Sequence, residues 1–176
     1  MHDEKGGMFF LYGYGGIGKT FMWNTLSSAL RFEAKIVLTV ASSGIASLLL
    51  PGGRIAHSKF KIPVPTLEHF VCNITKGSEL SNLMKLANLI IWDEVPMAHK
   101  FCFEALDRTL KDILREHNKS DFVFGGKVIV FEGDFRQIVH ATINSSYLWE
   151  HCQILNLTKN MRLLQQGLHN SIIVEI

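Results

Sequence analysis

The chain has 176 residues, of which 47% are hydrophobic and 19% are charged, as is typical of one folded domain with a single core and not of a disordered protein. Its three cysteines lack C-x-x-C spacing, which argues against a disulfide framework and a zinc site and favours a reducing compartment. The net charge of +2 permits a nucleic-acid partner without requiring one, and we expect no membrane association, because no secretory signal and no apolar run of ~18 residues is present.

The first predicted strand, residues 8–12, leads into a glycine-rich loop. Residues 13–20, GYGGIGKT, match the phosphate-binding pattern G-x-x-x-x-G-K-[ST] at every fixed position. Residues 21–30 contain no Gly or Pro and predict a helix. An ordinary glycine turn is the alternative, but strand, loop and helix are the context in which backbone N–H groups surround a phosphate. The predicted nucleotide-binding residues are Gly13, Gly15, Gly16, Ile17, Gly18, Lys19 and Thr20.

The next elements predict a parallel sheet. Residues 35–41 form a second β-branched run about two dozen residues after the first, which suits a βαβ unit. A short helix over 45–50 is stopped by Pro51, Gly52 and Gly53. Residues 54–77 are interrupted by lysines and prolines, and we expect an irregular excursion with short strands there.

A basic and aromatic cluster lies in this excursion. Arg54, Lys59 and Lys61 could contact phosphates, and Phe60 between them could stack on a base, which is how proteins hold single strands without reading sequence. An ordinary surface loop is the alternative.

An acidic pair follows the third predicted strand. Residues 80–86 predict a helix and 89–92 a buried strand, which ends at Asp93 and Glu94. Ligands in open α/β sheets bind outside the carboxyl ends of the strands, where this pair would meet the phosphate loop. Asp93 could hold Mg²⁺, and Glu94 could accept a proton from the attacking water. A solvated turn is the alternative for an acidic pair considered alone.

Residues 103–114 predict an amphipathic helix that packs on the sheet, because its apolar residues recur at helical spacing. Two acid-to-base pairs four residues apart, Glu104 with Arg108 and Asp107 with Lys111, predict a solvent-exposed face.

Two more strands complete the predicted sheet, over 127–131 and 154–157. Gln137 follows the first of them, and its amide suits a sensor of the γ-phosphate, because it can contact both phosphate oxygen and water. A polar turn is the alternative for this segment.

Six segments, in order from about residue 8 to residue 163, resemble the first motor domain of the Pif-type DNA helicases (petite integration frequency family), in the RecD-like branch of superfamily 1. The amino-acid sequences of these segments are most similar to those of the plant and Helitron-like branch. The resemblance implies a RecA-like P-loop NTPase fold, an α/β three-layer sandwich with a mostly parallel sheet. The segments are GYGGIGKT, ASSGIAS, GGRIAHSKFKIP, LIIWDEVPM, GGKVIVFEGDFRQI and LTKNMRL.

The resemblance also implies an activity. The cofactors would be ATP and Mg²⁺, and the reaction would be ATP-driven 5′ to 3′ unwinding of single-stranded or tailed duplex DNA. The setting would be DNA repair, recombination or telomere maintenance in the nucleus, or alternatively in the mitochondrion. A nucleotide-binding module without unwinding activity and an unrelated P-loop enzyme, such as a small-molecule kinase, are the competing functions; a kinase would need a substrate lid, which the sequence does not offer.

Family roles carry over onto matching positions. Gly18, Lys19 and Thr20 fall on phosphate and Mg²⁺ residues, Asp93 and Glu94 on the metal-and-base pair, Gln137 on the γ-phosphate glutamine, and Arg162 on the arginine that stabilises transferring charge. The candidate DNA contacts are Ser42, Ser43, His57 and Ser58, with Phe60 and Lys61 beside them.

The chain departs from the family pattern at several points. Ile17 replaces a usual threonine at a loop position expected to face away from the phosphates. Glu132 replaces a common glycine and Val139-His140 a usual Leu-Pro, and these two changes would shift the Gln137 loop. No adenine-contacting glutamine segment precedes Met8. We expect residues 1–163 to form the first motor domain, 164–176 to be a divergent tail, and the second motor domain to be absent, as in a truncated copy that begins late within its domain.

Overall fold

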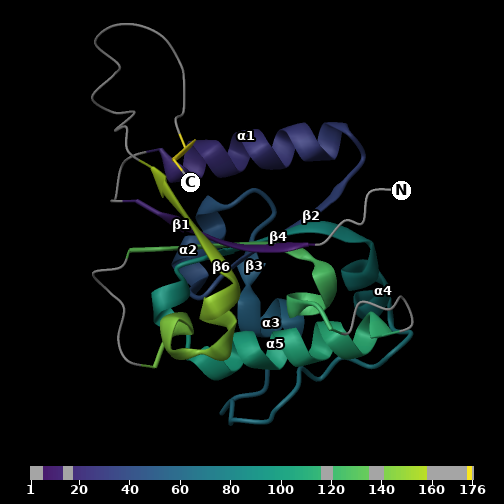
Figure 1. Cartoon of the computed structure of the whole chain (residues 1–176). Coiled ribbons are helices and arrows are strands. Elements are labelled where there is room, and N and C mark those ends of the chain that lie inside the picture. Colours follow the sequence, from purple (N-terminus) through teal and green to yellow (C-terminus); the bar gives the residue numbers. More distant parts are fainter. Residues whose placement is uncertain (1–5, 14–17, 116–120, 135–140, 158–173, 176) are drawn as a thin grey trace, which may run out of the picture.

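The computed structural model describes residues 6–13, 18–115, 121–134, 141–157 and 174–175 (Figure 1). Its sheet has the strand order β3-β2-β4-β5-β1-β6-β7. All described neighbours pair in parallel except β6 and β7, which are antiparallel. The strands are β1 (Gly7–Tyr12), β2 (Ile36–Ala41), β3 (Arg54–Ile55), β4 (Ala87–Asp93), β5 (Val128–Gly133), β6 (Cys152–Leu157) and β7 (Val174–Glu175).

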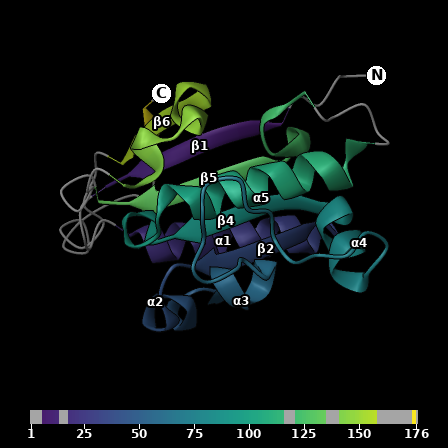
Figure 2. The same cartoon turned by 90° about the horizontal axis from the view of Figure 1, so that it is seen from below.

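Helices cover both faces of the sheet, and α1 and α5 lie on opposite sides in Figure 1. The α-helices are α1 (Lys19–Phe32), α2 (Gly44–Leu49), α3 (Ala56–Phe60), α4 (Glu79–Leu86) and α5 (Lys100–Ile113). Short 3-10 helices are η1 (Val95–Met97), η3 (Val123–Gly126), η5 (Ile143–Ser145) and η6 (Tyr147–His151). Figure 2 shows α5 lying along the sheet on the same side as α3 and α4. The predicted α/β three-layer class and mostly parallel sheet are confirmed.

Two buried clusters hold the layers together, because successive strand residues point to opposite faces. Leu11 packs with Trp23 of α1 and with α2 on one face, whereas its neighbour Phe10 packs with α3, α4 and α5 on the other. The amino-acid alternation within β1 therefore supplies both cores.

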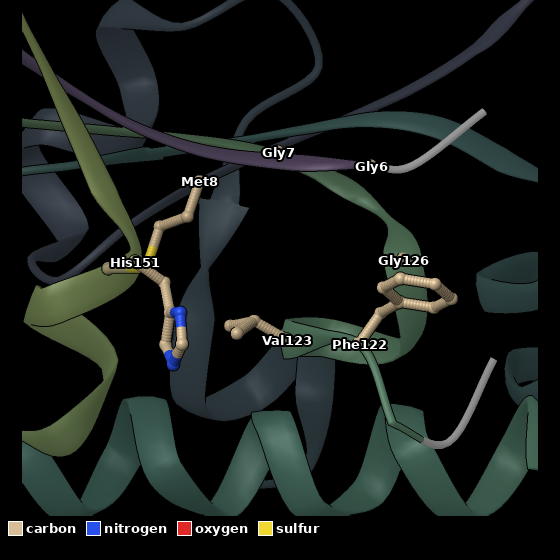
Figure 3. A pocket seen from close by; sticks show the side chains of 7 residues that line it. All are labelled: Gly6, Gly7, Met8, Phe122, Val123, Gly126 and His151. Carbon is tan, nitrogen blue, oxygen red and sulfur yellow. The ribbon is translucent and has the colours of Figure 1, made fainter. Parts of the chain in front are cut away.

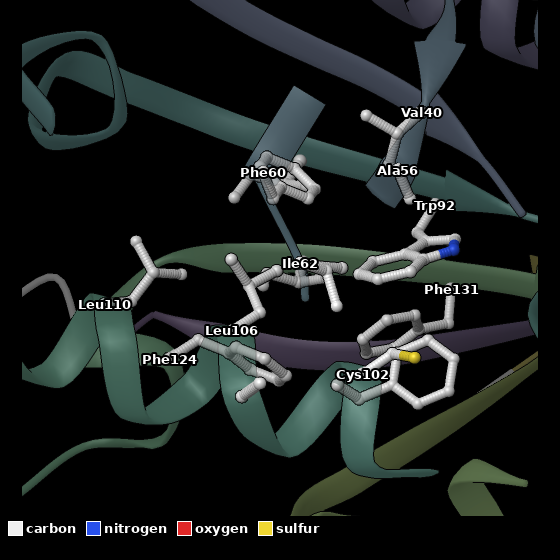
Figure 4. Close-up of a cluster of buried hydrophobic side chains, with 14 of the residues drawn as sticks. Val40, Ala56, Phe60, Ile62, Trp92, Cys102, Leu106, Leu110, Phe124 and Phe131 are labelled. Carbon is white, nitrogen blue, oxygen red and sulfur yellow. The ribbon is translucent and has the colours of Figure 1, made fainter. Parts of the chain in front are cut away.

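An aromatic group dominates the α5 side of the sheet (Figure 4). The Trp92 ring of β4 lies 4.7 Å from the Phe103 ring of α5, 5.8 Å from Phe60 of α3 and 6.1 Å from Phe131 of β5, measured between ring centroids. All four side chains are fully buried. Tilted aromatic pairs of this kind stabilise a fold beyond simple burial, and here they fix the position of the residue after Trp92, which is Asp93.

The helices and strands expected from the sequence are present within a few residues of their predicted ends. The excursion at 54–77 differs: it contains one two-residue strand, β3, and the helix α3, which the sequence did not predict. Five residues are too few to show a helical period, and α3 is stabilised instead by burial of Ala56 and Phe60, both with no exposed surface.

The expectation that the charged face of α5 is exposed to solvent is wrong. This face is not solvated, because Glu104 and Asp107 are buried. Asp107 accepts hydrogen bonds from the Phe124 backbone N–H and the Tyr147 hydroxyl, each at 2.6 Å, and its carboxylate also lies 2.9 Å from Lys111 Nζ. Residues from later in the chain therefore cover this face and use its acids to hold η3 and η6 against α5.

We predict that Asp107→Ala lowers the free energy of unfolding by about 3 kcal/mol, since it leaves buried donors without an acceptor. The matched control is Asp112→Ala on the same helix, whose ion pair with Lys76 is more than half exposed and should contribute less than about 1 kcal/mol. Urea denaturation measures both, and equal losses would contradict the assigned role of Asp107.

Candidate functional site

Strand order brings the predicted motifs to one edge of the sheet. β5 lies between β4 and β1, so the loop after β1, the acidic pair at the end of β4 and the end of β5 are neighbours. The register pairs Leu11 with Glu132 and Trp92 with Phe131. Glu132, near the carboxyl end of β5, therefore lies between the phosphate loop and Asp93.

Lys19 is the first residue of α1, and its side chain is largely buried. Its Nζ lies 2.5 Å from Glu132 Oε1 and donates to the Gly13 carbonyl at 2.8 Å. Gly18 precedes it with φ of 92°, a left-handed conformation that glycine adopts without a steric cost. The lysine of the loop is thus directed back across the loop toward β5.

Glu132 links three elements. In addition to Lys19, it accepts a hydrogen bond from Trp23 Nε1 at 3.2 Å, and it shares a side-chain hydrogen bond with Asp93. Trp23 and Lys19 lie one turn apart on α1. The carboxylate therefore connects α1 through β5 to the end of β4.

The two acids of this cluster have opposite protonation states. Burial, followed by the hydrogen bond and negative charge of Glu132, raises the pKa of Asp93 to about 8. Burial alone would raise the pKa of Glu132, but the Asp93 hydrogen bond, the Lys19 charge and the Trp23 donor together lower it. At neutral pH, Asp93 holds the proton and Glu132 is the ionised partner of Lys19.

Glu94 begins the turn into η1 in an unusual backbone conformation. Its φ and ψ are 53° and 43°, in the left-handed region, and its N–H donates to Asp93 Oδ1 at 2.7 Å. Gly133 permits the close approach of β5 to this turn, because a Cβ there would lie 2.5 Å from Pro96 Cδ. Such backbone strain persists only where the surroundings impose it, as at many functional sites.

The structure contradicts the DNA contact expected of Phe60. Its ring is fully buried against Trp92, so the prediction that it stacks on a base is wrong for this fold. Ser58 and Lys61 on either side of it are exposed.

The other candidate DNA residues have structural partners. Ser42 Oγ accepts the Trp92 indole N–H at 3.0 Å, and Ser43 Oγ caps α2 through the Ala46 N–H at 3.2 Å. His57 is half-buried, with Nε2 3.5 Å from Cys102 Sγ. Burial lowers the pKa of His57 and raises that of Cys102, so this pair is neutral and is not an activated nucleophile.

A metal ion would rely on few protein ligands. Among the described residues, no group of three or more His, Cys, Asp or Glu could hold one. Mg²⁺ usually takes few protein oxygens and completes its coordination shell with substrate phosphates and water. The Thr20 hydroxyl in the first turn of α1 and the Asp93 carboxylate are suitable ligands of this kind. The predicted residues Gly15, Gly16, Ile17, Gln137 and Arg162 lie outside the described residues.

A small hollow lies at the opposite edge of the sheet (Figure 3). It is lined by Gly6, Gly7, Met8, Phe122, Val123, Gly126 and His151. Because it adjoins the amino end of β1, it is separate from the edge that carries Lys19. Within the described part of the chain, no helix combines the length and apolar character needed to cross a bilayer.

Comparison with known sequences gives one family. Residues 1–173 match the family model described as PIF1-like helicase. The chain is 30% identical over 143 residues to ATP-dependent DNA helicase PIF4 of Trypanosoma brucei brucei, covering 79% of this chain and 17% of that protein. It is 31% identical over 136 residues to ATP-dependent DNA helicase Pif1 of Psychrobacter, covering 77% of this chain and 20% of that protein.

Solved structures agree with this match. Unliganded Pif1 from Bacteroides superposes with a TM-score of 0.72 at 25% identity, over 91% of this chain and 39% of that chain. Bacteroides Pif1 in complex with ADP-AlF3 and single-stranded DNA also gives a TM-score of 0.72 at 25% identity, over 92% of this chain and 40% of that chain. The chain thus spans about a fifth of the two curated relatives and two fifths of these solved chains.

The raised pKa of Asp93 predicts a pH dependence of folding. Between the ordinary value of 3.8 and about 8, the folded chain holds a proton that the unfolded chain has lost, so stability falls as pH rises through this window, by at most about 1.4 kcal/mol per unit. Glu132 has a lowered pKa, and its contribution is constant above its ordinary value of 4.5.

Asp93→Asn keeps a donor for Glu132 but cannot titrate. We expect its stability relative to the wild type to increase from pH 5 to pH 8 and then to level off, as measured by denaturation without nucleotide. Asp112→Asn serves as the control, and parallel profiles for Asp93→Asn and the wild type would contradict the shared-proton arrangement.

Proposed function

Because the chain belongs to the PIF1-like helicase family, we propose that it binds Mg-ATP and supplies the ATP-hydrolysing part of an ATP-dependent DNA helicase. The observation that carries the proposal is the position of Lys19. It follows a phosphate-binding loop and is joined through one carboxylate to Asp93, at the carboxyl edge shared by β1, β5 and β4. That edge is where α/β sheets bind ligands.

Lys19, Thr20, Asp93 and Glu94 have roles in the proposed reaction at this edge. Lys19 contacts the β- and γ-phosphates, while Thr20 and Asp93 hold Mg²⁺, which neutralises phosphate charge when bound. Asp93 must release its proton to do so. Glu94 accepts a proton from the attacking water. We assign Gln137 to γ-phosphate contact and Arg162 to stabilising the transferring charge, following the family pattern.

The proposed macromolecular partner is single-stranded or tailed duplex DNA. Two observations support it: similar proteins are named ATP-dependent DNA helicases, and a similar Bacteroides structure contains single-stranded DNA. Ser58 and Lys61 are exposed and available to a strand, and Ser42 and Ser43 follow β2 at the nucleotide edge. We further propose 5′ to 3′ unwinding in repair, recombination or telomere maintenance, a nuclear location with a mitochondrial alternative, and membership of the plant and Helitron-like branch.

A nucleotide-binding module without unwinding activity is the second candidate. It is favoured by the engagement of Asp93 with Glu132, because this contact opposes the metal binding on which hydrolysis, and so unwinding, depends. An ATP-dependent strand-displacement assay on a 5′-tailed duplex separates the two functions. Displacement that disappears in a Lys19 variant supports the helicase, and nucleotide binding without displacement supports the module.

We predict that Lys19→Ala weakens Mg-ATP binding by about tenfold or more, because it removes the ammonium group aimed across the loop. The measurement is a titration with a fluorescent ATP analogue, made at a temperature where the variant remains folded. Lys35→Ala is the control, since that lysine pairs with Glu33 on the exposed surface and should leave affinity unchanged. Unaltered affinity in Lys19→Ala would contradict the proposed site.

We predict a different pattern for Glu94→Gln. Nucleotide affinity should stay within about twofold, while ATP hydrolysis should fall by about a hundredfold or more, because an amide cannot accept the proton of the attacking water. Phosphate release with and without single-stranded DNA is the measurement. Turnover equal to that of the wild type would place the base elsewhere.

A further inference from the structure

Glu132 lies inside the proposed nucleotide site but has no role in the proposed reaction. Its side chain is 7% exposed, and that of Lys19 is 16% exposed. One carboxylate oxygen lies 2.5 Å from Lys19 Nζ, and the other accepts the N–H of Trp23. With Asp93 also hydrogen-bonded to this carboxylate, Glu132 is held from three directions.

The contact with Lys19 uses the same group that a phosphate would need. An ammonium has three donors; in this structure one is directed to the Gly13 carbonyl and another to Glu132. The third donor is open to a phosphate oxygen, but the phosphate would then share one buried ammonium with the Glu132 carboxylate, and the two anions repel each other. Phosphate binding at Lys19 therefore favours replacement of the Glu132 oxygen. A buried carboxylate that loses its cation is strongly disfavoured, so this replacement opposes binding.

We propose, resting on the proposed nucleotide binding, that Glu132 is an internal anion that occupies Lys19 until the phosphates of a magnesium-bound nucleoside di- or triphosphate displace it. Nucleotide binding is then an exchange of one anion for another at Lys19. The exchange weakens affinity, and because Asp93 is bound to the same carboxylate, it frees Lys19 and the metal-binding acid in one step.

A purely structural role for Glu132 makes the opposite prediction. If the carboxylate only stabilised the fold, then its removal would leave nucleotide affinity unchanged or would lower it. If it competes with phosphate, then its removal must raise affinity. The sign of the change therefore distinguishes the two roles.

The test is E132Q in the full 176-residue chain. Glutamine keeps the shape, can accept from Trp23 and can bond to Asp93, but it carries no charge to hold Lys19. Titration with a fluorescent ADP analogue in Mg²⁺ should show about tenfold tighter binding than the wild type. Glu104→Gln is the matched control and should leave affinity unchanged. This buried carboxylate of α5 accepts a hydrogen bond from Ser146, next to η6, and pairs with Arg108 of the same helix.

E132D provides a second variant that keeps the charge but shortens its reach toward Lys19. Its affinity should fall between those of the wild type and E132Q, and it carries the test if E132Q does not fold. Wild-type binding with no tightening in the folded variants would overturn this inference alone. Failure of both the wild type and the variants to bind nucleotide would overturn the proposed function as well.

Discussion

The structure depends on a buried acid–base contact at the carboxyl edge of the sheet. Because β5 lies between β1 and β4, a side chain near the end of β5 is placed to join the start of α1 to the acid at the end of β4, and Glu132 does so. Two carboxyl groups and one ammonium can share a buried site when one acid keeps its proton. The opposite pKa shifts of Asp93 and Glu132 correspond to that state.

Two tryptophans connect this contact to the hydrophobic cores. Trp23 and Trp92 are fully buried on opposite faces of the sheet, and each directs its indole N–H to a polar residue near the nucleotide edge, Glu132 and Ser42 respectively. A buried indole requires such a partner. Packing on both faces therefore orients the polar residues of the site, and the ring group around Trp92 positions Asp93 before any ligand arrives.

The spacing of apolar runs and the glycine loop predicted most of the sheet, the larger helices and the edge where the motifs meet. Other features depend on contacts between distant segments. The sequence predicts an exposed stacking ring at Phe60, but α3 directs this ring into the core. The sequence likewise predicts solvated acids on α5, but contacts with η3 and η6 bury them. Glu132 stood out only as a departure from a family glycine, since its partners follow from strand order. The roles of Gln137 and Arg162 stay predictions.

The most direct test of the central contact is a double-mutant cycle on Lys19→Met and Glu132→Gln, measured by urea denaturation of the nucleotide-free chain at pH 7. If the buried pair joins the loop to the sheet, then the double variant should lose less stability than the sum of the single variants, with a coupling of about 1–3 kcal/mol. Losses that add to within about 0.5 kcal/mol would show that the two residues act independently, and would contradict the account.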